Sequence, residues 1–245
     1  MTDYKHPYPD SALAAAHPFV AHDHPAVSDS ELGERSERFL AEMDRRRSVR
    51  MFDDRPVPRS VIENLIRAAA TAPSGAHMQP WTFVAISDPD LKRQIRTAAE
   101  EEEHTNYLEN RMNEEWQAAL APLGTDHHKE FLEIAPWLVV LFEQRFGTHH
   151  DGSKKTHYYV KESVGIAAGM FVTAVHQAGL ITLPHTPSPM AFLRKVLDRP
   201  DTERPFAMFP VGHPLPGVVV PDLARKPLGD IAIFRGGSPD GMMLP

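Results

Sequence analysis

The stretch "TAPSGAHMQPWTF", residues 71–83, places a Pro-Ser-Gly break directly before a strand-forming run. Residues 81–86, "WTFVAI", are rich in aromatic and β-branched side chains, which predicts a short strand. Gly75 and its small neighbours allow backbone N–H groups to approach a flat ligand closely, because they leave room for it. Taken alone, the break is better explained as a plain turn, so its meaning depends on the residues around it.

Positive charge gathers just upstream, at "RRRSVR", residues 45–50, where four of six residues are arginine. The guanidinium group is planar, permanently charged and rich in donors, and it therefore suits a phosphate. We expect Arg46, Arg47 and Arg50, with Ser48 between them, to hold one phosphate monoester. A solvated helix end explains the same spacing equally well.

The composition of the whole chain limits the classes of function. Its 245 residues carry a formal net charge of −7, which argues against nucleic acid or an anionic membrane as a partner. It contains no cysteine, so disulfides, thiolate metal sites and cysteine nucleophiles are excluded. The first twenty residues lack the basic start and apolar run of a secretory signal, and the longest apolar stretch, residues 137–142, is too short to span a bilayer. We expect a cytoplasmic protein with no membrane contact.

Hydrophobic periodicity predicts helices and strands in irregular alternation, which favours the α+β class over a doubly wound sheet. Residues 1–30 form an expected extended arm, residues 31–232 one domain and residues 233–245 a tail. The expected helices begin near Ser30, Pro58, Asp88 and Tyr159, and a short one covers residues 191–198. The expected strands are residues 81–86, 137–142, 181–183 and 206–212.

Together, "RRSVRMF" and "AAATAPSGAHMQPWTF" resemble the flavin-binding signature of the nitroreductase family. The further stretches "EEEEHTNY", "KKTHYYVKES", "HTPSP" and "VPDLARKPL" are similar to the iodotyrosine deiodinase branch of that family, and His77 stands where most nitroreductases have asparagine. The resemblance covers about residues 40–232. It implies an intertwined homodimer with a central, mostly antiparallel sheet flanked by helices, and two FMN sites at the subunit interface. It also implies reductive removal of iodide, and often of bromide or chloride, from halotyrosines.

The resemblance also assigns residues to the cofactor. The implied FMN contacts are Arg46, Arg47, Ser48, Val49 and Arg50 at the phosphate, Pro73 and Ser74 by the ring and ribityl chain, Pro184, His185 and Thr186 near the flavin edge, and Arg225 from the C-terminal part. The Thr186 hydroxyl is expected to lie by the flavin N5 and to take part in catalysis, an arrangement that suits single-electron steps.

A halotyrosine is a zwitterion, so its ammonium needs a carboxylate and its carboxylate needs a cation or a hydroxyl donor. The resemblance gives these roles to Glu103, Tyr107 and Lys129, and it places the backbone N–H of Ala76 at the substrate phenolate. Glu103 and Tyr107 are four residues apart, so they share one face of the expected helix. A solvated acidic run, a packing tyrosine and a surface lysine are the alternatives for each residue alone. Residues 104–128 look too polar to fold alone, and we expect them to order as a lid over the substrate.

Two segments depart from the family pattern, one at the expected flavin edge and one in the expected lid. Residues 184–189 read Pro-His-Thr-Pro-Ser-Pro where the family often has Thr-Thr-Thr-Pro-Leu-Asn. One residue is inserted between Tyr107 and Trp116, within the expected lid. Because of the insertion, the family's lid geometry and substrate range do not carry over directly to this chain.

Other chemistries find less support in the sequence. Adjacent histidine pairs, such as residues 127–128 and 149–150, would point to opposite sides of a strand, so we expect no metal site. No Gly-x-Gly-x-x-Gly fingerprint is present, so electrons are expected from a separate reductase or from NADP(H) docking transiently at the flavin. Two alternatives stay open: a general FMN nitroreductase or other flavin oxidoreductase acting on an aromatic substrate, and a flavin-binding protein without catalysis.

Overall fold

The computed structural model describes residues 8–108 and 114–236, which form two compact units that meet in sequence at Arg45 and Arg46. The first unit contains α1 (Ser11–Ala16) and α2 (Asp29–Arg45). The prediction of an arm without periodic structure was wrong at α1, where the Asp10 carboxylate accepts a hydrogen bond from the Leu13 N–H at 2.8 Å and caps the helix. The cap of α2 is Ser28 rather than the expected Ser30, since the Ser28 hydroxyl accepts from the Glu31 N–H.

The second unit is built around one antiparallel sheet, which confirms the expected α+β class. Its strand order is β1-β7-β3-β2, and β6 also pairs with β7. The strands are β1 (Phe52–Asp53), β2 (Trp81–Ile86), β3 (Trp137–Gln144), β6 (Ile181–Thr182) and β7 (Glu203–Pro214).

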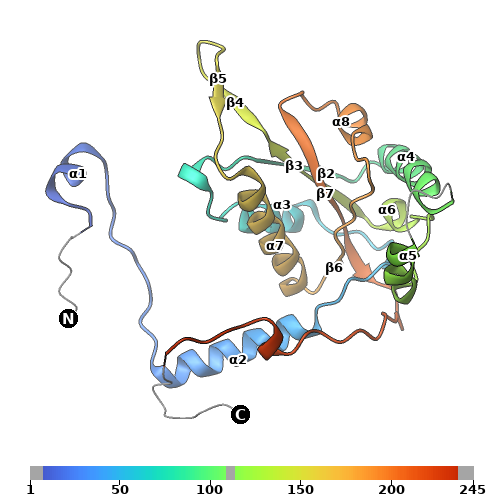
Figure 1. Cartoon of the computed structure of the whole chain (residues 1–245), viewed down its shortest axis with the longest axis horizontal. Coiled ribbons are helices and arrows are strands. Elements are labelled where there is room, and N and C mark those ends of the chain that lie inside the picture. The colour runs from blue at the N-terminus through green and yellow to red at the C-terminus, as the bar shows by residue number, and fades with distance from the viewer. Residues whose placement is uncertain (1–7, 109–113, 237–245) are drawn as a thin grey trace. The chain divides into compact units, whose positions relative to one another are not determined.

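Helices cover both faces of this sheet, as Figure 1 shows. One face carries α3 (Arg59–Ala69) and α7 (Val160–Gln177), and the other carries α4 (Pro89–Leu108), α6 (Phe131–Ile134) and α8 (Phe192–Val196). Successive side chains of a strand point to opposite faces, so a strand covered by helices on both faces needs consecutive apolar residues, as β3 has at residues 137–142. In β3, Val139 and Leu141 pack toward α3 and α7, whereas Leu138, Val140 and Phe142 pack toward α4 and α8.

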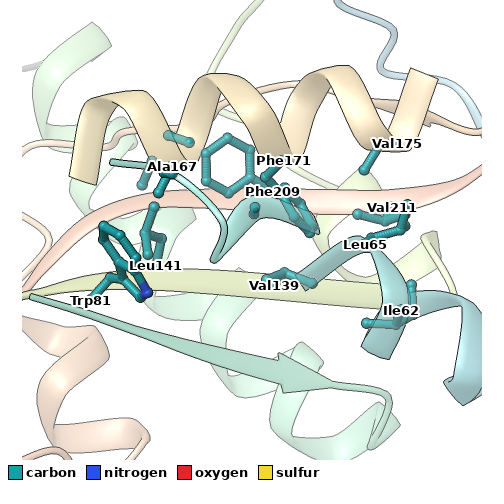
Figure 2. Packing of buried hydrophobic residues seen from close by; sticks show 14 of the residues in the cluster. Ile62, Leu65, Trp81, Val139, Leu141, Ala167, Phe171, Val175, Phe209 and Val211 are labelled. Atoms are coloured by element: carbon teal, nitrogen blue, oxygen red, sulfur yellow. The ribbon is translucent and has the colours of Figure 1, made fainter. Parts of the chain in front are cut away.

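The core between the sheet and α7 combines many aliphatic side chains with the aromatic rings of Trp81, Phe171 and Phe209 (Figure 2). Phe171 of α7 lies edge-on to Phe209 of β7, with ring centroids 5.5 Å apart, and tilted against Phe83 of β2 at 5.8 Å. Ile62 and Leu65 bring α3 into the same cluster. Full burial of each such side chain contributes about 1.5–3 kcal/mol, so this face fixes α7, and with it the loops at its two ends, firmly on the sheet.

The expected helix ends are confirmed where local chemistry sets them. The Asp88 carboxylate accepts from the Leu91 N–H at 2.7 Å and begins α4 at Pro89. After α7, Gly179 adopts φ +74° and its N–H bonds the His176 carbonyl, while the Leu180 N–H bonds the Val175 carbonyl. This pair of hydrogen bonds ends a helix through a left-handed glycine, as predicted.

Several elements were not predicted. They are the hairpin of β4 (Phe146–Thr148) and β5 (Lys154–Thr156), the helix α5 (Glu114–Leu120), and the short 3-10 turns η1 (Gly75–His77), η2 (Ala121–Leu123) and η3 (Leu228–Asp230). Within the expected lid, residues 104–128, residues 104–108 and 114–123 are helical. Residues 109–113 of that stretch lie outside the described residues. Within the described ranges, no helix has the length and apolarity needed to cross a membrane.

Candidate functional site

Two cavities of the second unit share a wall, because Arg50 and Leu123 line both of them. The sheet explains why distant segments meet here. The residues before β1 are tied to the end of β7, where the Leu215 N–H bonds the Met51 carbonyl. The residues after β6 are tied to the middle of β7, where His185 and Met208 exchange two backbone hydrogen bonds.

The first cavity, the arginine cleft, has a volume of about 280 Å³. Four of its lining residues are arginines and none of the ten is acidic. Its lining is Arg46, Arg47, Ser48, Arg50, Leu123, Val220, Pro221, Leu223, Ala224 and Arg225. Hydrogen bonds to backbone carbonyls orient two of the guanidinium groups: Arg225 donates to Arg46 at 2.8 Å, and Arg47 donates to Pro221.

The electrostatics of the arginine cleft favour an anion. Burial, together with the positive charges of Arg225 and Arg47, lowers the pKa of Arg46. Like charges crowded in this way repel one another, and a bound dianion would relieve that repulsion. The donor set therefore fits the phosphate end of FMN. Val49 is buried rather than exposed to the cleft, so only its backbone is available to a ligand.

The second cavity, the head-group pocket, has a volume of about 270 Å³ and is lined by both polar and apolar side chains. It brings together Glu103 and Tyr107 of α4 with Lys129, which precedes α6. The Lys129 ammonium lies 3.8 Å from a Glu103 carboxylate oxygen and 5.3 Å from the centroid of the Tyr107 ring. The structure thus places side by side three residues that are up to 26 positions apart in the sequence.

Lys129 is the most deeply enclosed member of this group, with a side chain only 3% exposed. Its backbone N–H donates to the Glu100 carboxylate at 2.7 Å, and its ammonium donates to the Asp126 carbonyl. Burial lowers the pKa of Lys129, although the charges of Glu103 and Asp126 oppose that shift. Burial raises the pKa of Glu103, and the charge of Lys129 opposes that shift. Both groups would regain favourable charge contacts if a zwitterion entered between them.

Pro184, His185 and Thr186, which the resemblance places at the flavin edge, line the head-group pocket and not the arginine cleft. The His185 ring packs edge-on against Phe131, with centroids 5.6 Å apart. Its Nε2 atom is enclosed and has no hydrogen-bond partner among the described residues. Burial, with smaller contributions from the charges of Lys129 and Arg50, lowers the pKa of His185 to about 3. The imidazole is therefore neutral at physiological pH.

Pro73, Ser74 and Ala76 line neither cavity in the single chain. Their loop packs against the start of α7 instead: the Gly75 N–H donates to the Ser163 hydroxyl, and a Cβ at Gly75 would lie 2.7 Å from the Tyr158 carbonyl oxygen. Only glycine allows this close approach.

The same loop is strained. Ala76, His77 and Gln79 all have left-handed φ values, between 48° and 53°, and so does Tyr159 beside them at 50°. Such conformations cost about 1–2 kcal/mol for each non-glycine residue and occur often at functional sites.

Some pocket residues were missed from the sequence. Asn106 is 7% exposed, and its side-chain amide donates to the Ser188 carbonyl at 2.9 Å, so it ties α4 to the loop after β6. The sequence could have revealed Asn106, because its spacing of three from residue 103, like the spacing of four to residue 107, places it on the same helix face. Thr125, which hydrogen-bonds Tyr107, lies in a loop without periodicity and gave no such signal.

Histidine side chains do come together near this site. His104 lies edge-on to His127 at 5.5 Å, and His127 is tilted against His128 at 4.0 Å. The expectation that residues 127 and 128 point to opposite sides was wrong, because they lie in a loop rather than a strand. Across residues 8–108 and 114–236, no group of three histidine, aspartate or glutamate side chains is arranged to hold a metal ion.

Comparisons with a family model and with known proteins agree with one another. Residues 43–213 match the model of the Nitroreductase family. A relative named "Iodotyrosine deiodinase" from Haliscomenobacter hydrossis is 52% identical over 208 residues, which are 85% of this chain and 93% of that protein. "Iodotyrosine deiodinase 1" of Homo sapiens is 44% identical over 87% of this chain and 73% of its own length.

A solved structure gives the same result for the fold. The crystal structure of oxidized iodotyrosine deiodinase bound to FMN and 3-iodo-L-tyrosine superposes with a TM-score of 0.68 at 29% identity, over 82% of this chain and 99% of that one. These matches confirm the resemblance that the two motifs suggested.

Proposed function

The chain belongs to the nitroreductase family, and on that premise we propose that it is an FMN-dependent enzyme that removes iodide reductively from iodotyrosine. Relatives of this name cover most of the chain at 44–52% identity, and one solved relative holds both FMN and 3-iodotyrosine. The arginine cleft supplies a cradle for the FMN phosphate. The head-group pocket next to it supplies partners for an amino acid.

The observation that carries the proposal is the pairing of a partly buried carboxylate with a buried ammonium in the pocket that adjoins the arginine cleft. A free amino acid is recognised by one anion and one cation held a few ångströms apart. Glu103 would bind the substrate ammonium, while Lys129 and the Tyr107 hydroxyl would bind its carboxylate. Arg50 lines both cavities, so a ligand in one would lie against a ligand in the other.

The reaction requires two electrons and one proton for each iodide released. The carbon–iodine bond breaks, iodide leaves with its electron pair, and a carbon–hydrogen bond forms on the ring. Bound FMN, once reduced, supplies the electrons. The protein would position the substrate through its head group, hold a hydroxyl at the flavin edge through Thr186, and bind the phenolate through the backbone N–H of Ala76.

This set of roles requires a homodimer. Pro73, Ser74 and Ala76 line neither cavity of their own chain, so a second copy would bring them to the flavin ring and the phenolate. The outer face of α7 supports such an arrangement, because a Cβ added at Gly165 or Gly169 would meet nothing within 4 Å, while Ile166 between them is 45% exposed. The backbone of a partner could approach that face closely.

Three further parts of the proposal concern access and electron supply. Residues 104–128 act as a lid whose closure over the substrate expels water from the head-group pocket. A separate reductase, or NADP(H) docking at the flavin, provides the electrons, because the sequence has no dinucleotide fingerprint. A cysteine-free chain is compatible with the cytoplasm, where we place the enzyme.

A titration and an assay on the purified FMN-loaded protein test the proposal. Adding 3-iodotyrosine should quench the flavin fluorescence, and reduction with dithionite should then release iodide and tyrosine. Replacing Lys129 by Ala should weaken the quenching affinity by about tenfold or more, because a buried charged contact is lost. Lys195→Ala, an exposed lysine of α8, serves as the matched control and should leave binding unchanged.

Other outcomes would contradict the proposal. Rapid nitroarene reduction with NAD(P)H and no iodide release would favour a general nitroreductase. Bound FMN whose reduced form no halotyrosine reoxidises would favour a flavin-binding protein without catalysis. A protein purified without yellow colour, which also fails to take up added FMN, would contradict the cofactor itself.

A further inference from the structure

We propose that the side chain of His185 determines specificity in the head-group pocket: its Nε2 atom forms a hydrogen bond with the carboxylate of the amino-acid substrate, beside Lys129. The inference rests on the proposed function, because it assumes that an amino acid occupies this pocket. The family resemblance assigned residue 185 to the flavin edge. The geometry of its imidazole points to a different role.

The His185 ring is held in one place from two directions. Its backbone exchanges two hydrogen bonds with Met208 of β7, at 2.8 and 2.9 Å, so the main chain is fixed to the central sheet. Its ring lies at 88° to the ring of Phe131, which itself is 7% exposed and anchored in α6. A ring fixed in this way presents its nitrogen without further loss of rotamer freedom.

The Nε2 atom of His185 is enclosed and has no partner among the residues that the structure describes. An enclosed nitrogen without a hydrogen bond costs about 1–3 kcal/mol, so such atoms normally find a partner. His185 lines the head-group pocket together with Lys129 and Ser188, so a ligand in that pocket lies against this residue.

The positive charges near His185 favour an anionic ligand. Lys129 and Arg50 line the same pocket, and their charges help keep the imidazole neutral. A neutral ring with a proton on Nε2 can donate one hydrogen bond without adding a third positive charge. Between two cations the favoured acceptor is an anion, and the substrate's anionic end that Lys129 would bind is its carboxylate.

This role predicts discrimination rather than general affinity. A ligand with the amino-acid head group satisfies Nε2, whereas a halophenol without that group leaves it unpaired. Sites with a buried polar group reject ligands that cannot pair with it. His185 would therefore add to the selection that Glu103 and Lys129 already provide.

Two variants of the FMN-loaded protein test this role. His185→Phe keeps a flat ring against Phe131 but removes the donor, and His185→Gln keeps a neutral N–H donor. Flavin-fluorescence titration with 3-iodotyrosine should give a dissociation constant about five- to tenfold higher for H185F and a value near wild type for H185Q. With 2-iodophenol, which has no head group, all three proteins should bind alike. His150→Phe, the same change at an exposed site between β4 and β5, should alter neither titration.

The outcomes separate this inference from the proposed function. Wild-type protein that fails to bind 3-iodotyrosine would contradict the proposed function. Wild-type protein that binds it, with H185F binding equally well, would overturn only the role of His185. A packing role would weaken both ligands together and lower the melting temperature, which also overturns the inference. If H185F does not fold, a loss of the preference for 3-iodotyrosine over 2-iodophenol in His185→Leu supports the role, and an unchanged preference overturns it.

Discussion

Burial disfavours the ionised form of the Glu103 carboxylate, and a positively charged ligand beside it would offset that cost. Burial raises its pKa above the ordinary 4.5, and Lys129 opposes that shift from 3.8 Å away. A substrate ammonium would add a second positive charge next to the carboxylate, so the pKa of Glu103 should be lower in the complex than in the free protein. Binding then releases a proton wherever free Glu103 is protonated, and the affinity for substrate must fall as the pH drops through the raised pKa.

The prediction is a loss of affinity for 3-iodotyrosine on the acid side of neutrality, beginning at a higher pH than an ordinary glutamate would allow. Fluorescence titrations between about pH 5 and pH 7.5 should show it, since the substrate's own carboxylate and ammonium keep their charges in that range. Glu103→Gln should bind about tenfold to a hundredfold more weakly at neutral pH. Its slope should be shallower than that of the wild type, and the part that remains belongs to the phenol of the substrate, which binds as the phenolate. Equal slopes in E103Q and the wild type would show that Glu103 does not titrate in this range.

Among the individual residues of the site, sequence patterns identified the charged ones better than the neutral ones. Glu103 and Tyr107 were found by helical spacing, and the resemblance supplied Lys129. Asn106 was missed although its spacing was equally good, because an asparagine on a polar helix stands out only when its burial is known. The environment of His185 also could not be predicted, since it depends on a bridge to Met208, more than twenty residues further along the chain.

Among the elements, those with a strong local signal were predicted and those fixed by tertiary contact were not. Residues 137–142 of β3 are a continuous apolar run because both faces of the strand are buried. The helix α7 ends just before Gly179 because that residue can adopt a left-handed conformation. The strands of the β4–β5 hairpin read Phe-Gly-Thr and Lys-Lys-Thr, with little apolar content and no alternation. Its pairing is set by the Asp151 turn and by the cation–π contact of Lys154 with Phe146, neither of which a periodicity reveals.

The turn at residues 74–79 allows a prediction about an element that stores strain. Ala76 has φ 49°, which costs about 1–2 kcal/mol for alanine and little for glycine. Ala76→Gly should therefore raise the free energy of unfolding by up to about 1 kcal/mol, after the entropy that glycine gains in the unfolded chain is subtracted. The melting temperature should rise by about 2–4 °C in thermal unfolding of the FMN-loaded protein.

Ala70→Gly is the matched control for that variant. Ala70 ends α3 in a right-handed conformation, with φ −71°, so glycine there should lower the melting temperature. If Ala76→Gly also lowers it, the left-handed conformation of the loop is not a source of strain in the working protein. Weaker binding of 3-iodotyrosine, together with higher stability, would indicate that the strain holds the Ala76 N–H in position for the phenolate.

For the whole molecule, the site as proposed is complete only when two copies meet. The arginine cleft and the head-group pocket belong to one chain, while the loop with Ser74 and Ala76 packs against α7 and lines neither cavity. The sequence indicated the dimer through the family resemblance alone, because glycines on a helix do not reveal whether their face is covered by the same chain or by another. The structure of the single chain leaves Gly165 and Gly169 uncovered within the part that it describes.

Gly169→Leu tests the dimer and its link to the cofactor in one experiment. A Cβ at Gly169 would meet nothing within 4 Å in the single chain, so the protomer should fold with the larger side chain in place. A second copy packed closely on α7 would clash with it, and light scattering should then report half the wild-type mass. FMN should be lost together with the dimer, because Ser74 of the second copy would no longer reach the ring. Thr97→Leu, a change at an exposed site on α4, is the control and should alter neither mass nor flavin content. A Gly169→Leu protein that stays dimeric and keeps its FMN would show that the second copy does not pack on this face of α7.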